Sequence, residues 1–289
     1  MAALAVVVLA TGLYAPNPIP SILVSDGLAP SAMQLLEASG ARVVDRHLSP
    51  SELADGGLAA FDAVIIRSAT TIDAAAIATG ASGKLRVVGR AGVGVDNIDI
   101  DAAFKHNCWV LNTPGASTAS VVELCLAHML AAARGVQDAD QGLKTGRWLK
   151  GQIRLGSKSG PRVGHELAGK RLGLLGFGRI AQGVARAASA LGMVVHAYSR
   201  TADAAIAAEL GVMLEPTDAE IFAKCTHVVV LCSLNDQTRG LVDARRMALM
   251  PKKGLDGTLC GSHLFNLARG GIVVEADAVR ALNDGDLAT

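Results

Sequence analysis

KRLGLLGFGRIAQGVARAASALGMVVHAYSR, residues Lys170 to Arg200, is the stretch that decides the fold. Its apolar run Leu172–Leu175 predicts a buried strand, which leads through a glycine turn into a helix with one apolar face and then a second strand over Met193–Tyr198. Gly176 permits the tight turn, and Gly178 lets a pyrophosphate approach the backbone amides at the helix start. Because the G-x-G-x-x-A pattern lies between a strand and a helix, it predicts a dinucleotide-binding unit.

The residues after the second strand bear on the choice of cofactor. An acidic residue at this place accepts hydrogen bonds from the ribose hydroxyls of NAD, whereas an arginine can accommodate the 2′-phosphate of NADP. This chain has Ser199 and Arg200 there, and no acid. The sequence therefore predicts NAD or NADP as the cofactor and favours NADP.

Composition narrows the class of protein. A chain of 289 residues is long enough for two domains, and its net charge of +1 gives no reason to expect a nucleic-acid or membrane partner. The five cysteines are odd in number and show no C-x-x-C spacing, which argues against a disulfide framework or a zinc site. We therefore expect a cytoplasmic protein without a bound metal.

The first twenty residues differ from the rest of the chain. They carry no charged side chain and end in a proline-rich stretch, Pro16–Pro20. This composition fits a targeting leader, a wrongly assigned start of the chain, or a first strand before a proline-rich linker. If residues 1–20 are a leader, the expected location changes to an organelle such as a plastid or mitochondrion.

Strand and helix patterns alternate from Ile22 onward, which predicts parallel sheets with helices on both faces. We expect a substrate-binding domain over residues 21–113 and a nucleotide-binding domain over residues 114–289, with a long helix at Ser117–Arg134. The glycine-rich segment Lys150–Gly164 is predicted to be a loop. Lys252–Ser262 is predicted to be a flexible insertion with Cys260 exposed.

Arginines and glycines follow several of the predicted strands, where open parallel sheets bind ligands. The clusters are Arg67-Ser68, Arg90–Gly94, Ser233 and Ala268–Gly271. Guanidinium groups at strand ends suit bidentate recognition of a carboxylate or phosphate, and Gly92 and Gly94 would let backbone amides approach the same anion. The pattern predicts a small anionic substrate.

Several motifs carry a resemblance to a known family. The segments are RSAT (67–70), GRAGVGVDN (89–97), the glycine turn of residues 176–181 and LFNLARGG (264–271). Over most of Ile22–Leu287 the chain resembles the D-isomer-specific 2-hydroxyacid dehydrogenases. The resemblance implies a flavodoxin-like substrate domain, a Rossmann domain and a homodimer. It also implies hydride transfer between a nicotinamide cofactor and a D-2-hydroxy acid, with conversion of D-3-phosphoglycerate to 3-phosphohydroxypyruvate in serine biosynthesis as the expected reaction.

The resemblance and the strand-end positions together give the candidate site residues. Arg269 is the expected catalytic residue, holding the carboxylate and carbonyl oxygen of the substrate. The expected substrate-binding residues are Arg67, Ser68, Arg90, Gly92, Val93 and Gly94. The expected cofactor-binding residues are Val93, Gly176, Gly178, Arg179, Ile180, Ser199, Arg200, Ser233, Leu267, Ala268 and Arg269.

The chain also departs from the family pattern. The catalytic acid and histidine of the family lie beyond Leu287, and none of the seven histidines occupies the family position; His263 precedes its strand and should lie at the wrong end of the sheet. We therefore expect a fragment, truncated within its nucleotide-binding domain, with weak or absent turnover. Two alternatives stay open: an NADPH-dependent glyoxylate or hydroxypyruvate reductase, and a non-catalytic nucleotide-sensing protein on the same scaffold.

Overall fold

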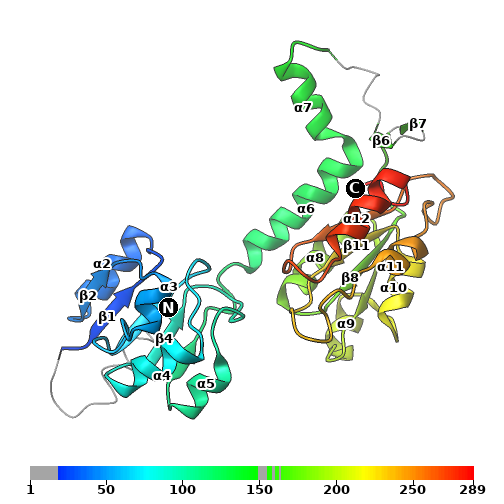
Figure 1. The fold of residues 1–289 in the computed structure, drawn as a ribbon. Helices are drawn as coiled ribbons and strands as arrows, with labels where there is room; N and C mark the ends of the chain where they lie inside the picture. The colour runs from blue at the N-terminus through cyan, green and yellow to red at the C-terminus, as the bar shows by residue number, and fades with distance from the viewer. Residues whose placement is uncertain (1–18, 149–154, 158–159, 163) are drawn as a thin grey trace. The chain divides into compact units, whose positions relative to one another are not determined.

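The computed structural model describes residues 19–148, 155–157, 160–162 and 164–289. These residues belong to two compact units, Met1–Ser117 and Thr118–Thr289 (Figure 1). Each unit contains one five-stranded sheet in which every neighbouring pair of strands is parallel. This arrangement confirms the predicted α/β class with two doubly wound sheets. Most of the predicted leader or linker lies outside the described residues.

The first unit has the strand order β2-β1-β3-β4-β5, which is the flavodoxin-like order. Its elements are β1 (Ser21–Val24), α2 (Pro30–Ala38), β2 (Arg42–Asp45), α3 (Pro50–Ala54), β3 (Ala63–Ile66), α4 (Ala74–Ser82), β4 (Val87–Arg90), α5 (Ile100–Lys105) and β5 (Trp109–Leu111). All four residues of β3 are buried. A central parallel strand is covered on both faces, which is why its sequence AVII is continuously apolar.

Side chains near the helix starts fix several boundaries of the first unit. The Ser49 hydroxyl accepts a hydrogen bond from the Glu52 amide at 3.3 Å, and the Glu52 carboxylate accepts one from the Ser49 amide at 2.9 Å. This reciprocal pair is a capping box, which satisfies two amides that the helix leaves unpaired. Asp73 and Asp99 cap α4 and α5 by a single bond each, in which the carboxylate accepts from one backbone amide.

The second unit has the strand order β10-β9-β8-β11-β12. Read from β8 as the first strand, this is the 3-2-1-4-5 order of a Rossmann fold. Its elements are α6 (Thr118–Arg134), α7 (Val136–Lys144), β6 (Leu155–Ser157), β7 (Gly160–Arg162), β8 (Arg171–Leu175), α8 (Arg179–Ala190), β9 (Val194–Tyr198), α9 (Ala204–Glu209), β10 (Met213–Leu214), α10 (Asp218–Lys224), β11 (His227–Val230), α11 (Ala244–Leu249), β12 (His263–Asn266) and α12 (Glu275–Asp284).

Two apolar layers enclose the sheet of the second unit. Leu172, Leu174 and Val229 pack in one cluster with side chains of α6 and α8. Leu175 and Val228 face the other cluster, which contains side chains of α10, α11 and α12. Successive side chains of a strand point to opposite faces, so each central strand supplies both layers.

Two segments differ from the prediction. Part of the predicted loop forms a short antiparallel pair, β6 with β7, held by backbone hydrogen bonds that need no apolar pattern in the sequence. The predicted exposure of Cys260 is also wrong, because only 3% of this residue is exposed. Its backbone amide donates to the Lys252 carbonyl at 3.0 Å, which folds this segment back on itself just before strand β12.

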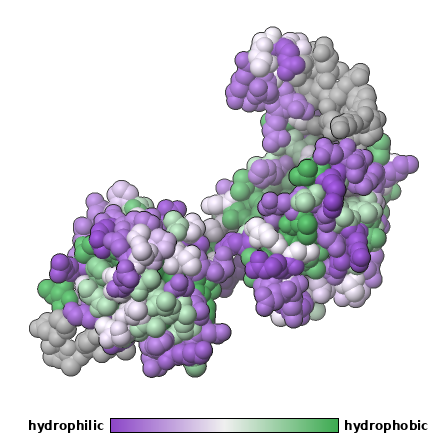
Figure 2. Space-filling model, viewed as in Figure 1, coloured by the Kyte–Doolittle hydropathy of each residue, from purple (hydrophilic) through white to green (hydrophobic). Residues whose placement is uncertain are grey.

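Within the described residues, no single helix is long and apolar enough to cross a membrane. Helices α6 and α7 reach the length and composition of a span only when taken together, and they are bent by 73° where they meet. The face shown in Figure 2 is largely hydrophilic, with smaller apolar areas scattered between polar residues.

Candidate functional site

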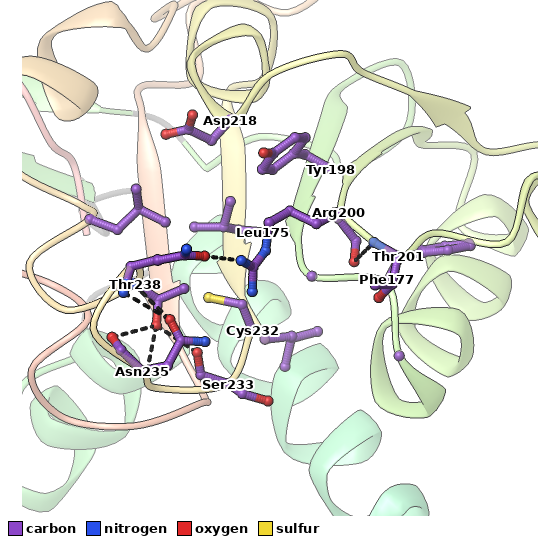
Figure 3. Close-up of a pocket in the computed structure, with 16 residues that line it drawn as sticks. Leu175, Phe177, Tyr198, Arg200, Thr201, Asp218, Cys232, Ser233, Asn235 and Thr238 are labelled. Atoms are coloured by element: carbon purple, nitrogen blue, oxygen red, sulfur yellow. Dashed lines mark hydrogen bonds between the residues drawn. The ribbon is translucent and has the colours of Figure 1, made fainter.

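A cavity of about 490 Å³ opens at the carboxyl ends of β8, β9 and β11 (Figure 3). Strand β9 follows β8 on one side, whereas β11 pairs with β8 on the other, so the strand order reverses at this point. Such a reversal leaves a crevice in which open parallel sheets bind ligands. The lining residues are Leu175, Gly176, Phe177, Gly178, Tyr198, Ser199, Arg200, Thr201, Asp218, Leu231, Cys232, Ser233, Asn235, Gln237, Thr238 and Leu241.

The two glycines of the turn have different physical roles. Gly176 has φ +105°, and a Cβ atom there would lie 2.8 Å from the Cys232 backbone nitrogen, so only glycine fits. A Cβ atom at Gly178 would meet no atom within 4 Å. The space in front of Gly178 is therefore open to a ligand, as expected for a turn that receives a pyrophosphate.

Helix α8 begins directly behind this space. Gly178 is its N-cap residue and makes no side-chain capping hydrogen bond. Backbone amides of the first turn can therefore serve as donors for an anion, and the helix dipole favours negative charge there. Of the predicted contacts in this turn, Arg179 is exposed and Ile180 is partly buried against the core.

The residues after β9 form the far side of the cavity. In Figure 3 the Arg200 guanidinium extends across the cavity, where it donates a hydrogen bond to the Gln237 side chain. Asp218 is the one acidic residue in the lining, and its carboxylate accepts from Arg246 Nε at 3.0 Å and lies 2.9 Å from Arg246 Nη2. Because Arg246 already neutralises that carboxylate, the guanidinium of Arg200 gives this end of the cavity a positive charge.

Part of the cavity wall was not predicted from the sequence. The Thr238 hydroxyl donates to the Ser233 carbonyl at 2.7 Å and accepts from the Asn235 amide at 2.8 Å. These bonds close the loop that follows β11, and they place Asn235 and Thr238 beside the predicted contact Ser233 (Figure 3). In the sequence, the signal for a ligand contact here is the position directly after a buried strand. That signal identifies Ser233 but does not reach Asn235 or Thr238, which come later in the loop.

Arg269 lies in the loop that follows β12, the strand next to β11 in the sheet. The Asn266 side chain holds this loop, since its amide donates to the Arg269 carbonyl at 2.9 Å and its oxygen accepts from the Ala268 amide at 3.2 Å. Leu267, Ala268 and Arg269 are partly buried and do not line the cavity described above. His263 starts β12, so the prediction that it lies at the opposite end of this strand from Arg269 is confirmed.

In the first unit, a buried carboxylate holds the loop that carries Arg67 and Ser68. Asp26, whose side chain is 3% exposed, accepts hydrogen bonds from the Arg67 amide at 2.7 Å, the Thr70 amide at 3.1 Å and the Thr70 hydroxyl at 2.5 Å. From the other side, the Asn97 amide group donates to the Arg67 and Thr70 carbonyls at 2.9 and 2.6 Å. The side chains of Arg67 and Ser68 stay exposed at the tip of this fixed loop.

Replacing Asp26 with asparagine is expected to lower the free energy of unfolding by about 3 kcal/mol at neutral pH, because an amide group cannot accept all of these charge-assisted bonds. Burial by itself would raise the pKa of Asp26, but the hydrogen bonds from Thr70 and Arg67 outweigh it and hold the pKa below its usual value. The carboxylate therefore stabilises the fold at neutral pH, and this contribution is lost as the pH falls through the folded-state pKa.

Urea unfolding measures this effect when it is done at neutral pH and again at about pH 4, the ordinary pKa of a carboxyl group. The difference between the wild type and Asp26→Asn should shrink at the lower pH. Asp45→Asn, an exposed aspartate at the end of β2, is the matched control and should change little. Equal stability of Asp26→Asn and wild type at neutral pH would contradict the assignment.

The contacts of Arg90 and Gly92 differ from the prediction that the Gly92 amide approaches an anion. The Gly92 amide donates to the Arg90 carbonyl at 2.8 Å, so it is already engaged within the chain rather than turned toward an anion as predicted. The space beside Gly92 is filled by the Arg90 guanidinium, since a Cβ atom there would lie 1.4 Å from Arg90 Nη1. Arg90 Nε is buried and has no hydrogen-bond partner among the described residues, which leaves a donor for a ligand.

The remaining predicted residues lie close to Arg90. Val93 is 36% exposed, and its carbonyl accepts a hydrogen bond from the Asn112 side chain at 2.7 Å. Gly94 is partly buried in the same turn. Apart from Arg269, the residues predicted to hold the substrate thus belong to the first unit, and the predicted cofactor residues, apart from Val93, belong to the second.

Comparison with known proteins gives the class of protein. Residues 126–289 match the profile described as "D-isomer specific 2-hydroxyacid dehydrogenase, NAD binding domain". The match covers more than half of the chain and includes the glycine turn, the cavity and Arg269. The chain therefore belongs to the D-isomer-specific 2-hydroxyacid dehydrogenases.

Individual proteins are similar to the chain over most of its length. It is 37% identical over 268 residues to D-3-phosphoglycerate dehydrogenase of Rattus norvegicus, covering 92% of this chain and 46% of the relative. It is 35% identical over 266 residues to the protein of the same name in Methanocaldococcus jannaschii, covering 92% and 47%. The chain thus spans just under half of the length of these relatives. Among solved structures, TT0316 protein from Thermus thermophilus has a TM-score of 0.77 at 29% identity, covering 93% of this chain and 79% of that one.

Proposed function

We propose that this chain binds a nicotinamide nucleotide in the cavity at β8, β9 and β11, and belongs to an oxidoreductase that oxidises D-3-phosphoglycerate to 3-phosphohydroxypyruvate. The observation that carries the proposal is the open space in front of Gly178 at the uncapped start of α8. The names of the similar proteins from Rattus norvegicus and Methanocaldococcus jannaschii support this choice of substrate.

In this proposal the cofactor supplies hydride transfer, and the chain supplies binding and orientation. The amides at the start of α8 receive the paired phosphates, and Ser233 contacts the nucleotide beyond β11. Arg269 holds the carboxylate and carbonyl oxygen of the substrate, while Arg67 and Arg90 bind its anionic groups in a bidentate manner. A guanidinium stays charged at every working pH, so these three groups need no proton transfer to bind.

We also propose that the cofactor is NADP rather than NAD. Arg200 is the exposed cation at the end of the cavity where β9 terminates, and the carboxylate of Asp218 is occupied by Arg246. A guanidinium at this place can bind a 2′-phosphate, whereas the ribose hydroxyls of NAD would lack the acidic acceptor that they usually find.

Arg200→Asp should reverse this preference. We expect NADPH affinity to fall by about 10- to 100-fold, because a charge-assisted bond of about 1.5–3 kcal/mol becomes a repulsion, while NADH affinity rises. Calorimetric titration of the purified chain with each nucleotide measures both changes. Arg186→Asp, which makes the same charge change at an exposed position of α8, is the control. Unchanged NADPH affinity in Arg200→Asp would show that the cofactor lies elsewhere or carries no 2′-phosphate here.

The same arginine favours a second candidate activity, NADPH-dependent reduction of glyoxylate or hydroxypyruvate. Assays with D-3-phosphoglycerate, glyoxylate and hydroxypyruvate, each with NAD(H) and NADP(H), separate the two reactions. Dominant glyoxylate reduction would replace the first proposal. Nucleotide binding without turnover of any of these substrates would instead favour a nucleotide-sensing role.

We further propose that the chain pairs with a second copy through α6 and α7. Leu124 and Leu130 of α6 and Leu143 of α7 are exposed at 51%, 42% and 59%, which gives these two helices apolar surface that a second copy could cover. Light scattering that gives the mass of one chain at micromolar concentration would contradict the dimer.

A further inference from the structure

Three buried histidines meet at the amino end of the second sheet, away from the cofactor cavity. His227 begins β11 and His263 begins β12, and the two residues are partners in the parallel register. His165 comes from the segment before β8. The three residues are 6% (His165), 0% (His227) and 2% (His263) exposed. Because they come from three separate segments, only the folded sheet brings them together.

The distances between their ring nitrogens approach those of a metal centre. His165 Nε2 and His227 Nε2 lie 3.2 Å apart, and one ring nitrogen of each histidine lies within 4.8 Å of one from each of the others. Tetrahedral zinc with bonds of about 2.0–2.1 Å to nitrogen requires ligand atoms about 3.3–3.4 Å apart. The first pair already has about this spacing, and the ligand atom of the third histidine lies within 4.8 Å of both.

Hydrogen bonds on the outer side of the cluster orient two of the rings. His227 Nδ1 lies 2.9 Å from the Thr226 hydroxyl, and His263 Nδ1 lies 2.8 Å from the Thr289 hydroxyl. At His227 this bond leaves Nε2, which faces His165 Nε2, as the ligand atom, and outer hydrogen bonds of this kind are usual at histidine metal sites. His263 Nε2 donates to the Cys260 carbonyl at 2.9 Å, so both ring nitrogens of His263 have a partner, and metal binding requires this ring to give up one of the two bonds.

A buried lysine and a cavity lie beside the cluster. Lys170 is the buried cation near the cluster, and Asp256 neutralises it at 2.9 Å. A cavity of about 220 Å³, lined by His165, Arg134, Glu166 and neighbouring apolar residues, offers a path for an ion.

We propose that His165, His227 and His263 form a binding site for a zinc-type divalent metal ion that joins β11, β12 and the segment before β8. Three imidazoles without a carboxylate favour zinc, cobalt, nickel or copper over magnesium or calcium. The site takes no part in nucleotide or substrate binding, so it neither depends on nor tests the proposed oxidoreductase activity. Its role is to hold together the end of the sheet opposite the cofactor cavity.

Cobalt(II) titration tests this site, because tetrahedral cobalt gives visible absorption bands that report its ligands directly. The purified chain, with any affinity tag removed and chelator dialysed away, should bind one cobalt ion with such bands, and zinc should displace it. His165→Gln and His227→Asn should weaken cobalt binding by at least about tenfold. His106→Gln and His128→Gln, which change exposed histidines elsewhere, should bind as the wild type does.

His165→Gln is the decisive variant, because His165 lies outside the sheet and its loss should leave the fold intact by circular dichroism. Wild-type protein that is folded yet gives no cobalt bands overturns the proposal and leaves the cluster as a hydrogen-bonded group of neutral imidazoles. Equal cobalt affinity in the wild type and in folded His165→Gln overturns it too. NADPH titration of the same samples should be unchanged, which separates this result from the fate of the proposed function.

Discussion

Gly176→Ala is expected to lower the free energy of unfolding by about 3 kcal/mol, because alanine would have to adopt a positive φ and its Cβ atom would overlap the neighbouring backbone. The residue has φ +105°, and the added Cβ atom would lie 2.8–2.9 Å from backbone atoms of Leu231 and Cys232. Those atoms follow a central strand and cannot move aside as the end of a side chain could. Urea unfolding measures the loss, and nucleotide binding should fall with it because the turn itself shifts.

Gly178→Ala is the matched variant in the same turn. Its φ is −81° and its Cβ would meet no atom within 4 Å, so stability should change by less than about 0.5 kcal/mol. The methyl group would nevertheless occupy the space proposed for the pyrophosphate, and NADPH affinity should fall by about tenfold or more. Full NADPH affinity in Gly178→Ala would show that the phosphates do not lie there.

This pair also shows why the cofactor end could be predicted from sequence. A glycine turn between a strand and a helix is a local feature of the sequence. Gly176 and Gly178, which are only two residues apart, therefore indicate where a phosphate fits. The alternating strands could be predicted for a similar reason, since strands such as AVII in β3 are buried on both faces and stay apolar throughout. Strand β10 escaped prediction because Met213 and Leu214 form only two residues and are both exposed.

Features built from distant residues could not be predicted. Asp26 holds Thr70, which is 44 residues away, and nothing near Asp26 in the chain indicates that its carboxylate points at that loop. The histidine cluster joins His165 to His227 across 62 residues, and the register of β11 and β12 adds His263. The spacing of the cysteines, which argued against a zinc site, carries no information about a site built from histidines.

The sequence did indicate Arg90 and Gly92 as neighbours of an anion, but it assigned the wrong role to the glycine. Its amide is bound to the Arg90 carbonyl, and its missing side chain makes room for the Arg90 guanidinium. The glycine at position 92 indicates that a small residue is needed there. Only the packing shows whether a ligand or a side chain of the chain itself fills the space.

Gly92→Ala is therefore expected to act through Arg90. A Cβ atom at Gly92 would lie 1.4 Å from Arg90 Nη1 and 2.5 Å from its Cζ, so the guanidinium must leave its place. Because the end of a flexible side chain moves at little cost, stability should stay close to that of the wild type. Affinity for 3-phosphohydroxypyruvate should fall by about 10- to 100-fold, the effect of losing a charge-assisted hydrogen bond, and Arg90→Ala should cause a similar loss.

A double-mutant cycle distinguishes this mechanism from a contact between Gly92 and the substrate. If the glycine acts only by admitting the guanidinium, Gly92→Ala should have no further effect in the Arg90→Ala background, since the group that it displaces is already gone. Calorimetry with 3-phosphohydroxypyruvate measures all four proteins, and Gly115→Ala, where a Cβ would meet no atom within 4 Å, serves as the control. Additive losses would mean that the substrate approaches the Gly92 backbone itself, as the sequence first suggested.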